Sequence, residues 1–234
     1  MARLARVVIP GLPHHVTQRG NGRARTFFSD ADYALYRDLL AKHCRAAKVE
    51  VWAWCLMPNH VHLILVPSDA DGLRRALAAV HRRYAGIIQA RRKRTGHFWQ
   101  GRFGAAVMDE AHLAAALRYV SLNPVRARLV ERARDWRWSS TRAHLSGKSD
   151  GITALTPIRA RFPRFADLLD DEPETDLFDR LRAAESIGRP LGDERFLARI
   201  ERLTARALRP RKRGPKPKAA SEEKQGDLLN ALSP

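Results

Sequence analysis

Two apolar segments on either side of a short turn constrain the fold of this chain more than any other feature. Residues 49–57 (VEVWAWCLM) are rich in β-branched and aromatic side chains, and residues 60–66 (HVHLILV) have the same character. Such residues favour the pleated surface of a sheet. Pro58 and Asn59 between the segments are common turn residues, and Pro67 closes the second segment. We therefore expect two consecutive strands of a sheet.

Further strands and helices flank these two strands. Ser29 with Asp32, and Ser68 with Asp71, each form a capping box directly before an apolar helical period. A third helix is expected to stop at Asn123–Pro124. In chain order, the expected ranges are strand 14–19, helix 29–47, strands 49–57 and 60–66, helix 68–87, strand 103–108 and helix 109–123.

This order of elements predicts an α+β fold. The first six elements follow the ferredoxin-like split βαβ pattern, a four-stranded antiparallel sheet with helices on one face. Helical periods at 177–184 and 194–207 predict a helical C-terminal extension. We expect three regions: a folded unit over residues 1–145, the extension over 146–208, and a disordered basic tail over 209–234 that begins RPRKRGPKPK.

The net charge of +18 narrows the function classes. A strongly positive chain attracts polyanions, either nucleic acid or an anionic membrane surface. No apolar run approaches the roughly 20 residues that cross a bilayer, and the apolar N-terminal stretch is too short for a signal peptide. The two cysteines exclude a disulfide framework. We expect a cytoplasmic protein that binds nucleic acid and no membrane.

His60 and His62 are the first candidates for chemistry. Alternation along a strand places both imidazoles on one face of the sheet, with Val61 on the other. Neighbouring neutral imidazoles suit a shared metal ion. The alternative is two ordinary histidines on a sheet. A structural zinc site with Cys55 lacks the four ligands that such a site needs.

Tyr119 and Asn123 are a second candidate pair. They lie four residues apart on the expected third helix and so share one face of it. Leu113, Leu117 and Val120 cover the neighbouring face, which leaves Tyr119 pointing away from the core. The alternative is a tyrosine at the core boundary and an asparagine that merely ends a helix.

Four sequence blocks, taken together, resemble the IS200-like one-tyrosine (HUH) transposases, and most of all the REP-associated tyrosine transposases. The blocks are GLPHHVTQRGNGR at 11–23, MPNHVHLIL at 57–65, GHFWQGRF at 96–103 and RYVSLNPVRARLV at 118–130. They occur in the order and spacing of the family and cover roughly residues 5–145. The resemblance makes residues 1–145 the expected catalytic domain.

The resemblance implies a nuclease and strand transferase that acts on single-stranded DNA with hairpins or palindromic repeats. Tyr119 is the implied nucleophile, and it would form a 5′-phosphotyrosine link. His60 and His62 are the implied metal ligands, with Asn123 as the third, where relatives commonly have Gln. The implied ion is Mg²⁺ or Mn²⁺, and imidazole ligands favour Mn²⁺. Whether the protein acts as a monomer or a homodimer stays open.

DNA-binding candidates come from the basic stretch and two loops. Residues 72–106 carry many Lys and Arg but no Asp or Glu, which favours a phosphate track over a solvated helix face. Trp99 is either a base-stacking residue or part of a packed turn, and the loop after the first strand is either a DNA contact or a simple turn. The candidates are Arg19, Asn21, Arg23, Arg82, Arg83, Arg91, Arg92, Arg94, Trp99, Gln100 and Arg102.

A binding protein without catalysis is the competing hypothesis. The same order of elements builds an RRM-like sheet, which binds single-stranded nucleic acid through aromatic residues on its central strands. Here, the strand face expected to be exposed carries His60 and His62 instead. The sequence therefore favours the enzyme.

Overall fold

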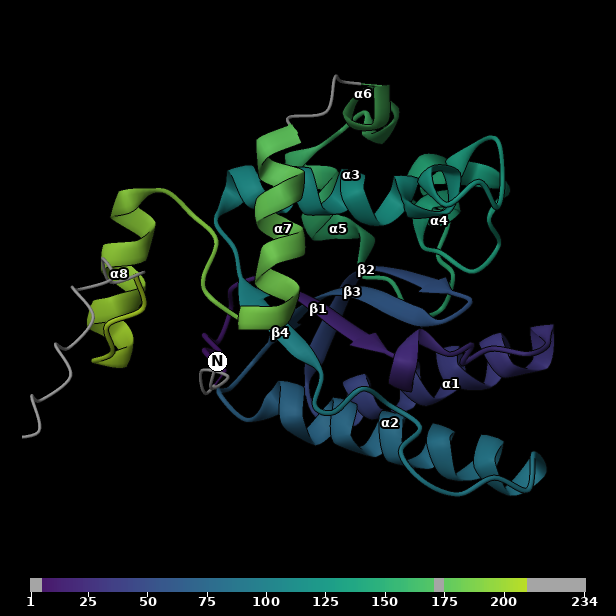
Figure 1. Cartoon of the computed structure of the whole chain (residues 1–234). Coiled ribbons are helices and arrows are strands. Elements are labelled where there is room, and N and C mark those ends of the chain that lie inside the picture. The colour runs from purple at the N-terminus through teal and green to yellow at the C-terminus, as the bar shows by residue number, and fades with distance from the viewer. Residues whose placement is uncertain (1–5, 171–174, 210–234) are drawn as a thin grey trace, which may run out of the picture.

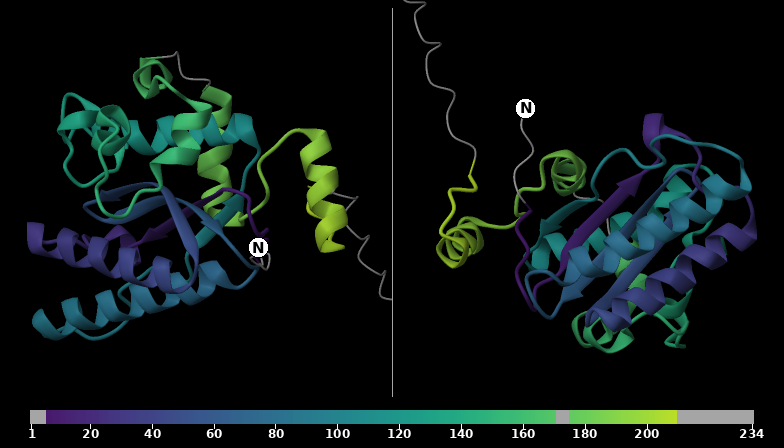
Figure 2. Two further views of the ribbon diagram at one scale, coloured as in Figure 1. Left: turned by 180° about the vertical axis from the view of Figure 1, so that it is seen from behind. Right: turned by 90° about the horizontal axis from the view of Figure 1, so that it is seen from below.

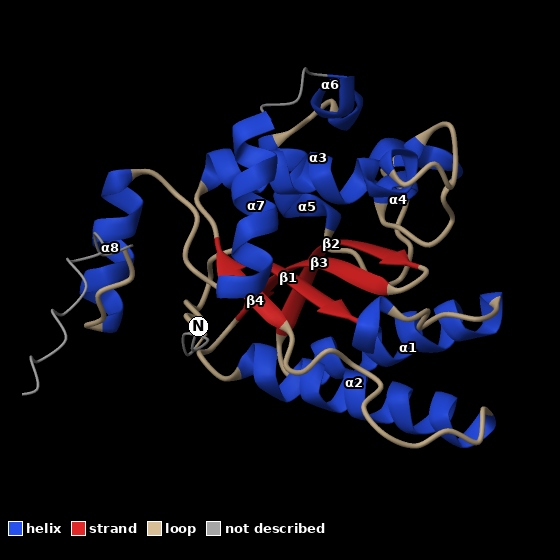
Figure 3. Ribbon diagram, in the orientation of Figure 1, coloured by secondary structure: helices blue, strands red, loops and turns tan. Residues whose placement is uncertain are grey.

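A four-stranded antiparallel sheet lies at the centre of the fold, as the computed structural model shows for residues 6–170 and 175–209 (Figure 1). The strands are β1 (His14–Arg19), β2 (Val49–Met57), β3 (His60–Pro67) and β4 (Gly104–Val107), in the order β2-β3-β1-β4. Helices α1 (Asp30–Ala46) and α2 (Gly72–Arg91) pack on one face of this sheet (Figure 3). The predicted α+β, ferredoxin-like fold is confirmed.

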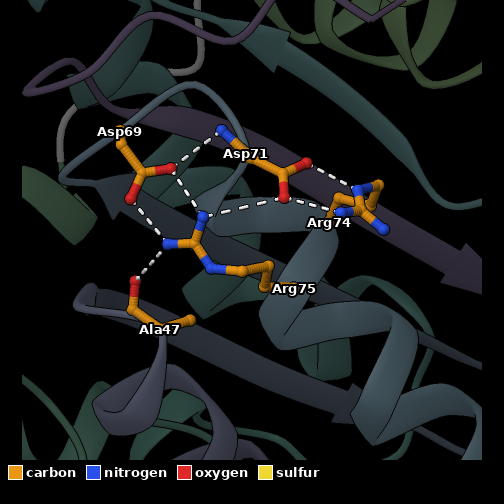
Figure 4. A network of polar contacts seen from close by, with 5 residues as sticks. All are labelled: Ala47, Asp69, Asp71, Arg74 and Arg75. Carbon is orange, nitrogen blue, oxygen red and sulfur yellow. Dashed lines mark hydrogen bonds and ion pairs between the residues drawn. The ribbon is translucent and has the colours of Figure 1, made fainter.

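The capping boxes predicted the start of α1 correctly but not the start of α2. The Asp32 carboxylate accepts the backbone N–H of Ser29 over 3.1 Å, so the first capping box starts α1 as expected. The second box does not start its helix at Ser68, because α2 begins only at Gly72. Asp69 and Asp71 instead bind Arg75 and Arg74 in a network of ion pairs at the start of α2 (Figure 4).

The second face of the sheet is covered as well. Helix α3 (Glu110–Arg126) packs against β2 and β3, and α7 (Thr175–Ile187) packs against α3 and β4 (Figures 1 and 2). Apolar side chains from these elements form a second core, which includes Ile64, Leu117 and Leu181. Helices α1 and α2 share one face of the sheet, as predicted. The other face was expected to be exposed, and this expectation is wrong because α3 and the extension cover it.

Pro124 lies inside α3, so the prediction that this residue stops the helix is wrong. A proline removes one backbone donor but leaves its own carbonyl free to accept. The carbonyl of Asn123 accepts the N–H of Ala127, and that of Pro124 accepts the N–H of Leu129, both over 2.9 Å. These bonds let the helix continue past Pro124 to its end at Arg126.

The other helices of the described residues are shorter. They are η1 (Asn21–Arg23), η2 (Ala133–Asp135), α4 (Thr141–Ser146), α5 (Leu155–Arg161), α6 (Phe165–Asp170) and α8 (Glu194–Thr204). The helical C-terminal part is therefore present as predicted, and α8 packs on Val7 and Val107 through Ile200. Of the predicted basic tail over 209–234, Arg209 is ordered by ion pairs with Glu194 and Glu201, and residues 210–234 lie outside the described residues. Within the described part of the chain, no helix is long and apolar enough to cross a membrane.

Candidate active site

His60 and His62 lie on the sheet face that α3 covers. Across the β1–β3 ladder, Arg19 is the partner of His60 and Thr17 the partner of His62. On the other side of β3, Met57 and Cys55 of β2 are the respective partners. Cross-strand partners project from the same face of a sheet. The strand alternation predicted from the sequence thus brings both imidazoles together, with Arg19 on the same face.

A third histidine, which the sequence analysis did not single out, completes this cluster. His15 Nε2 lies 3.0 Å from His62 Nδ1, within hydrogen-bonding distance. The two ring planes are nearly parallel, 6° apart, and the ring centroids are separated by 5.3 Å. The rings of His60 and His62 meet edge to face at 4.8 Å.

The side chain of Asn59 holds His60 from the hairpin turn. Its Oδ1 lies 2.6 Å from His60 Nδ1. Its amide Nδ2 donates to the backbone carbonyl of Arg23 over 3.0 Å. Since this second bond orients the amide, Oδ1 faces the imidazole, and the loop after β1 is tied to the turn before β3.

Burial keeps these imidazoles uncharged. Desolvation, helped by the positive charge of Arg19, lowers the pKa of His60 to about 3. Desolvation alone lowers the pKa of His15 to about 4. Desolvation and the neighbouring charges lower the pKa of His62 well below its usual value. Neutral imidazole is the form that binds metal.

Tyr119 projects from α3 onto the histidine cluster. Its ring meets the ring of His62 edge to face at 5.4 Å and that of His15 at 6.1 Å. The ring of Phe178 on α7 also packs on it at 5.4 Å, and the guanidinium of Arg126 lies 4.8 Å above the tyrosine ring. Only 6% of Tyr119 is exposed, so the expectation that it points away from the core is wrong. The extension supplies the side chain that covers it.

Asn123 lies one turn along α3 from Tyr119 and is partly exposed. Its backbone carbonyl continues the helix by accepting from Ala127. Among the residues that the structure describes, no three His, Cys, Asp or Glu side chains are grouped so as to hold a metal ion. A metal site here would thus consist of the two histidines of β3 together with a ligand of another type, such as an amide oxygen.

Two loops meet beside His60 and bring most of the predicted DNA-binding residues to one place. The N–H of Asn21 donates to the carbonyl of Phe98 over 2.9 Å, and the N–H of Gln100 donates to the carbonyl of Arg19 over 2.8 Å. The N–H of Gly20 donates to the carbonyl of Asn59 in the hairpin turn over 2.9 Å. The polar residues gathered at this junction are Arg19, Asn21, Arg23, Gln100 and Arg102.

Trp99 faces the protein interior from this junction. Its indole N–H donates to the backbone carbonyl of His81 over 3.0 Å. Its ring contacts those of Tyr84 and Phe98 at 5.9 and 4.7 Å. These contacts favour the packed-turn alternative over base stacking.

The remaining basic candidates lie on and after α2. The Arg91 guanidinium forms an ion pair with the buried Asp32 carboxylate at 2.6 Å, and that of Arg92 lies 3.9 Å above the Phe28 ring. Arg94 follows the helix and is exposed. Arg82 and Arg83 are exposed on α2 itself, which covers the face of the sheet opposite to His60 and His62. The structure therefore does not bring these last two residues to the candidate site.

Comparisons with known proteins show which proteins this chain is similar to. A profile of the family described as "Transposase IS200 like" matches residues 10–123. A protein of Haemophilus influenzae described as a REP-associated tyrosine transposase is 27% identical over 116 residues, which are 45% of this chain and 66% of the relative. This chain thus spans just under two thirds of that relative.

Two solved structures are also similar. One is a REP-associated tyrosine transposase bound to a REP hairpin, with a TM-score of 0.55 and 21% identity over 66% of this chain and 92% of the other. This similarity supports the shared fold. The other, described as a transposase of Deinococcus radiodurans, has a TM-score of 0.37 and 21% identity over 51% of this chain and 95% of the other. The resemblance of this chain to the IS200-like transposase family is thus confirmed by the profile over residues 10–123 and by the curated relative, and the solved structure shares its fold.

Proposed function

We propose that this protein is a metal-dependent enzyme that nicks and rejoins single-stranded DNA, with Tyr119 as its nucleophile. The observation that carries the proposal is the contact of the Tyr119 ring with His62, at 5.4 Å, on the face that also holds His60. A tyrosine oxygen and two neutral imidazoles in one buried cluster combine a nucleophile with potential metal ligands. Residues 1–145 would form the catalytic domain.

The reaction would proceed by direct displacement at phosphorus. The Tyr119 oxygen would bond to the phosphorus atom and lose its proton, and the bond to the 3′ oxygen would break. The products are a 5′-phosphotyrosine link and a free 3′-OH. Because the phosphodiester energy is kept in the covalent link, an incoming 3′-OH can reverse the step and join a different strand.

The donor set of the site fits a divalent metal ion. His60 and His62 are neutral and adjacent, and Asn123 offers an amide oxygen one turn after Tyr119. A bound divalent cation offsets the negative charge of the phosphate and orients it. Imidazole ligands favour Mn²⁺ over Mg²⁺, and the oxygen ligand suits either ion.

The junction of the two loops would guide the DNA strand to this cluster. Arg19 lies directly across the ladder from His60, and its charge already lowers the pKa of that imidazole. Arg23 and Arg102 are exposed at the same junction. Asn21 and Gln100, also exposed there, offer polar side chains for base edges or phosphates.

Hairpin or palindromic single-stranded DNA is the proposed substrate. Support comes from the solved relative that is bound to a REP hairpin. The binding-only alternative would need an open sheet surface with aromatic residues. In this structure, α1 and α2 cover one face and α3 and α7 the other. The arrangement therefore favours the enzyme.

The test compares two conservative variants on a labelled hairpin oligonucleotide with Mn²⁺. Tyr119→Phe should abolish nicking while retaining DNA binding, because it removes only the nucleophilic oxygen. Tyr33→Phe is the matched control, since Tyr33 is also buried among aromatic rings, stacked on Phe27 at 4.4 Å, but lies under the opposite sheet face. Nicking by Tyr119→Phe at the wild-type rate would refute the proposal.

A further inference from the structure

The contact between His15 and His62 has a defined chemical consequence. His15 lies on β1 and is almost fully buried, with 2% exposure, as is His62 with 0%. Their ring nitrogens Nε2 and Nδ1 are 3.0 Å apart, and the ring planes lie within 6° of parallel. The bond therefore joins two neutral imidazoles in a fixed geometry.

A neutral imidazole carries one N–H and one lone pair, on different nitrogens. If His62 Nδ1 carries the proton and donates to His15 Nε2, the lone pair of His62 lies on Nε2. If His15 donates instead, His62 Nε2 carries the proton and is unable to bind a metal ion. The direction of this one hydrogen bond thus decides whether His62 is ready to act as a ligand.

His60 shows the same arrangement with a different partner. Its Nδ1 lies 2.6 Å from Asn59 Oδ1, and an amide oxygen only accepts. His60 must then donate from Nδ1, which leaves the lone pair on Nε2. Histidines that bind metals usually donate their second N–H to a nearby acceptor, which fixes the tautomer and the ring orientation. His60 and His62, the two candidate ligands, therefore each have a hydrogen-bond partner at Nδ1.

We propose that His15 is the positioning residue for His62: it accepts the Nδ1 proton of His62 and thereby presents Nε2 of that ring to the metal. This role rests on the proposed function, in which His62 is a metal ligand. His15 acts through His62 and not on the ion, because its Nε2 is already engaged by the neighbouring ring. Asn59 has the equivalent role for His60.

Two substitutions of His15 distinguish its role as a hydrogen-bond acceptor from the space that its ring fills. His15→Phe keeps a flat ring at this position but removes the acceptor, so the Mn²⁺ affinity of the DNA-free protein should fall by about 10–100-fold. His15→Gln places an amide oxygen near the position of Nε2 and should restore most of that affinity. The measurement is the concentration of free Mn²⁺, followed by electron paramagnetic resonance during a titration.

His14→Phe is the matched control. His14 is equally buried on the same strand, but its nitrogens bond to backbone atoms of Leu12 and Ile9. This variant should lose thermal stability without losing Mn²⁺ affinity. Equal Mn²⁺ affinity in wild type and in folded His15→Phe would overturn the positioning role, as would an equal loss in His15→Phe and His15→Gln.

A spectroscopic measurement on the wild-type protein keeps the inference testable if a variant fails to fold. Long-range ¹H–¹⁵N correlation spectra of the metal-free protein report which ring nitrogen of each histidine is protonated. The inference predicts Nδ1–H for His62, with its signals identified by their absence in His62→Gln. An Nε2–H tautomer would contradict it. A wild-type protein that neither binds Mn²⁺ nor forms a DNA adduct would instead refute the proposed function, whatever the tautomer.

Discussion

Buried, uncharged histidines distinguish this protein at the scale of single residues. Desolvation is the main cause that lowers the pKa of His14 and His144 to about 4 and that of His81 to about 3. Each has a fixed hydrogen-bond partner away from the candidate site, such as the hydroxyl of Tyr36 for His81 and the carbonyl of Trp52 for His144. Imidazoles are thus used as neutral polar groups within the core.

These shifts predict that the free energy of unfolding falls as the pH falls. Each group binds a proton near pH 6.5 when unfolded but only near pH 3–4 when folded, so unfolding takes up protons in this window. The stability is fully present above about pH 6.5 and is lost towards pH 4, at about 1.4 kcal/mol per pH unit for each histidine. Urea denaturation at a series of pH values measures the loss.

His81→Gln should reduce this slope, because it removes one of the buried titrating groups. Leu203→Ala, at an exposed position on α8, removes no titrating group and is the control, which should leave the slope unchanged. A wild-type stability that is constant between pH 6.5 and 4 would show that the buried histidines do not resist protonation.

The loops at one end of the sheet act together at the scale of structural elements. Backbone hydrogen bonds join the loop after β1, the hairpin turn and the loop before β4 beside His60. The start of α2 lies in the helix layer on the opposite face of the sheet from His60, and its arginines Arg74 and Arg75 are bound by Asp69 and Asp71 (Figure 4). Two arginines of the loop junction should therefore contribute more to DNA binding than the two arginines at the start of α2.

The salt dependence of DNA affinity tests this difference. Each phosphate contact to single-stranded DNA contributes about −0.7 to the slope of log K against log salt concentration. The double variant Arg23→Gln/Arg102→Gln should flatten the slope by about 1.4, which is twice that contribution. The charge-matched control, Arg74→Gln/Arg75→Gln, should change it little. Fluorescence anisotropy of a labelled oligonucleotide measures both, and identical slopes would place the DNA elsewhere.

Local sequence patterns predicted part of this structure but not the contacts between residues that are far apart in the chain. Alternation along one strand was enough to place His60 and His62 on one face, and capping chemistry located the start of α1. The contact of His15 with His62 depends on the register between strands that are far apart in the chain, which no local pattern contains. The burial of Tyr119 depends on Phe178, a residue of the extension.

The whole molecule is a sheet covered on both faces, and the extension is part of its folded body. Helix α7 packs against β4 and crosses α3 in two views of the molecule (Figures 1 and 2). Its Leu181 is fully buried in the core beneath α3, while Leu203 on α8 is exposed. The extension thus contributes to the stability of the sheet as well as covering Tyr119.

Leu181→Ala should therefore destabilise the entire protein by about 2–5 kcal/mol, the usual cost of removing a buried leucine side chain. Leu203→Ala is the matched control and should change the free energy of unfolding by less than about 0.5 kcal/mol. Chemical denaturation followed by tryptophan fluorescence measures both. A Leu181→Ala protein with wild-type stability would mean that α7 does not pack on the sheet in solution.

The central claim, that Tyr119 attacks DNA, is tested most directly by locating the covalent bond. The full-length protein is incubated with hairpin single-stranded DNA and Mn²⁺, digested with trypsin and nuclease, and analysed by tandem mass spectrometry. The account predicts a nucleotide phosphate on Tyr119. The same adduct on Tyr33, Tyr36 or Tyr84, or cleavage of the DNA without any protein-linked nucleotide, would contradict it.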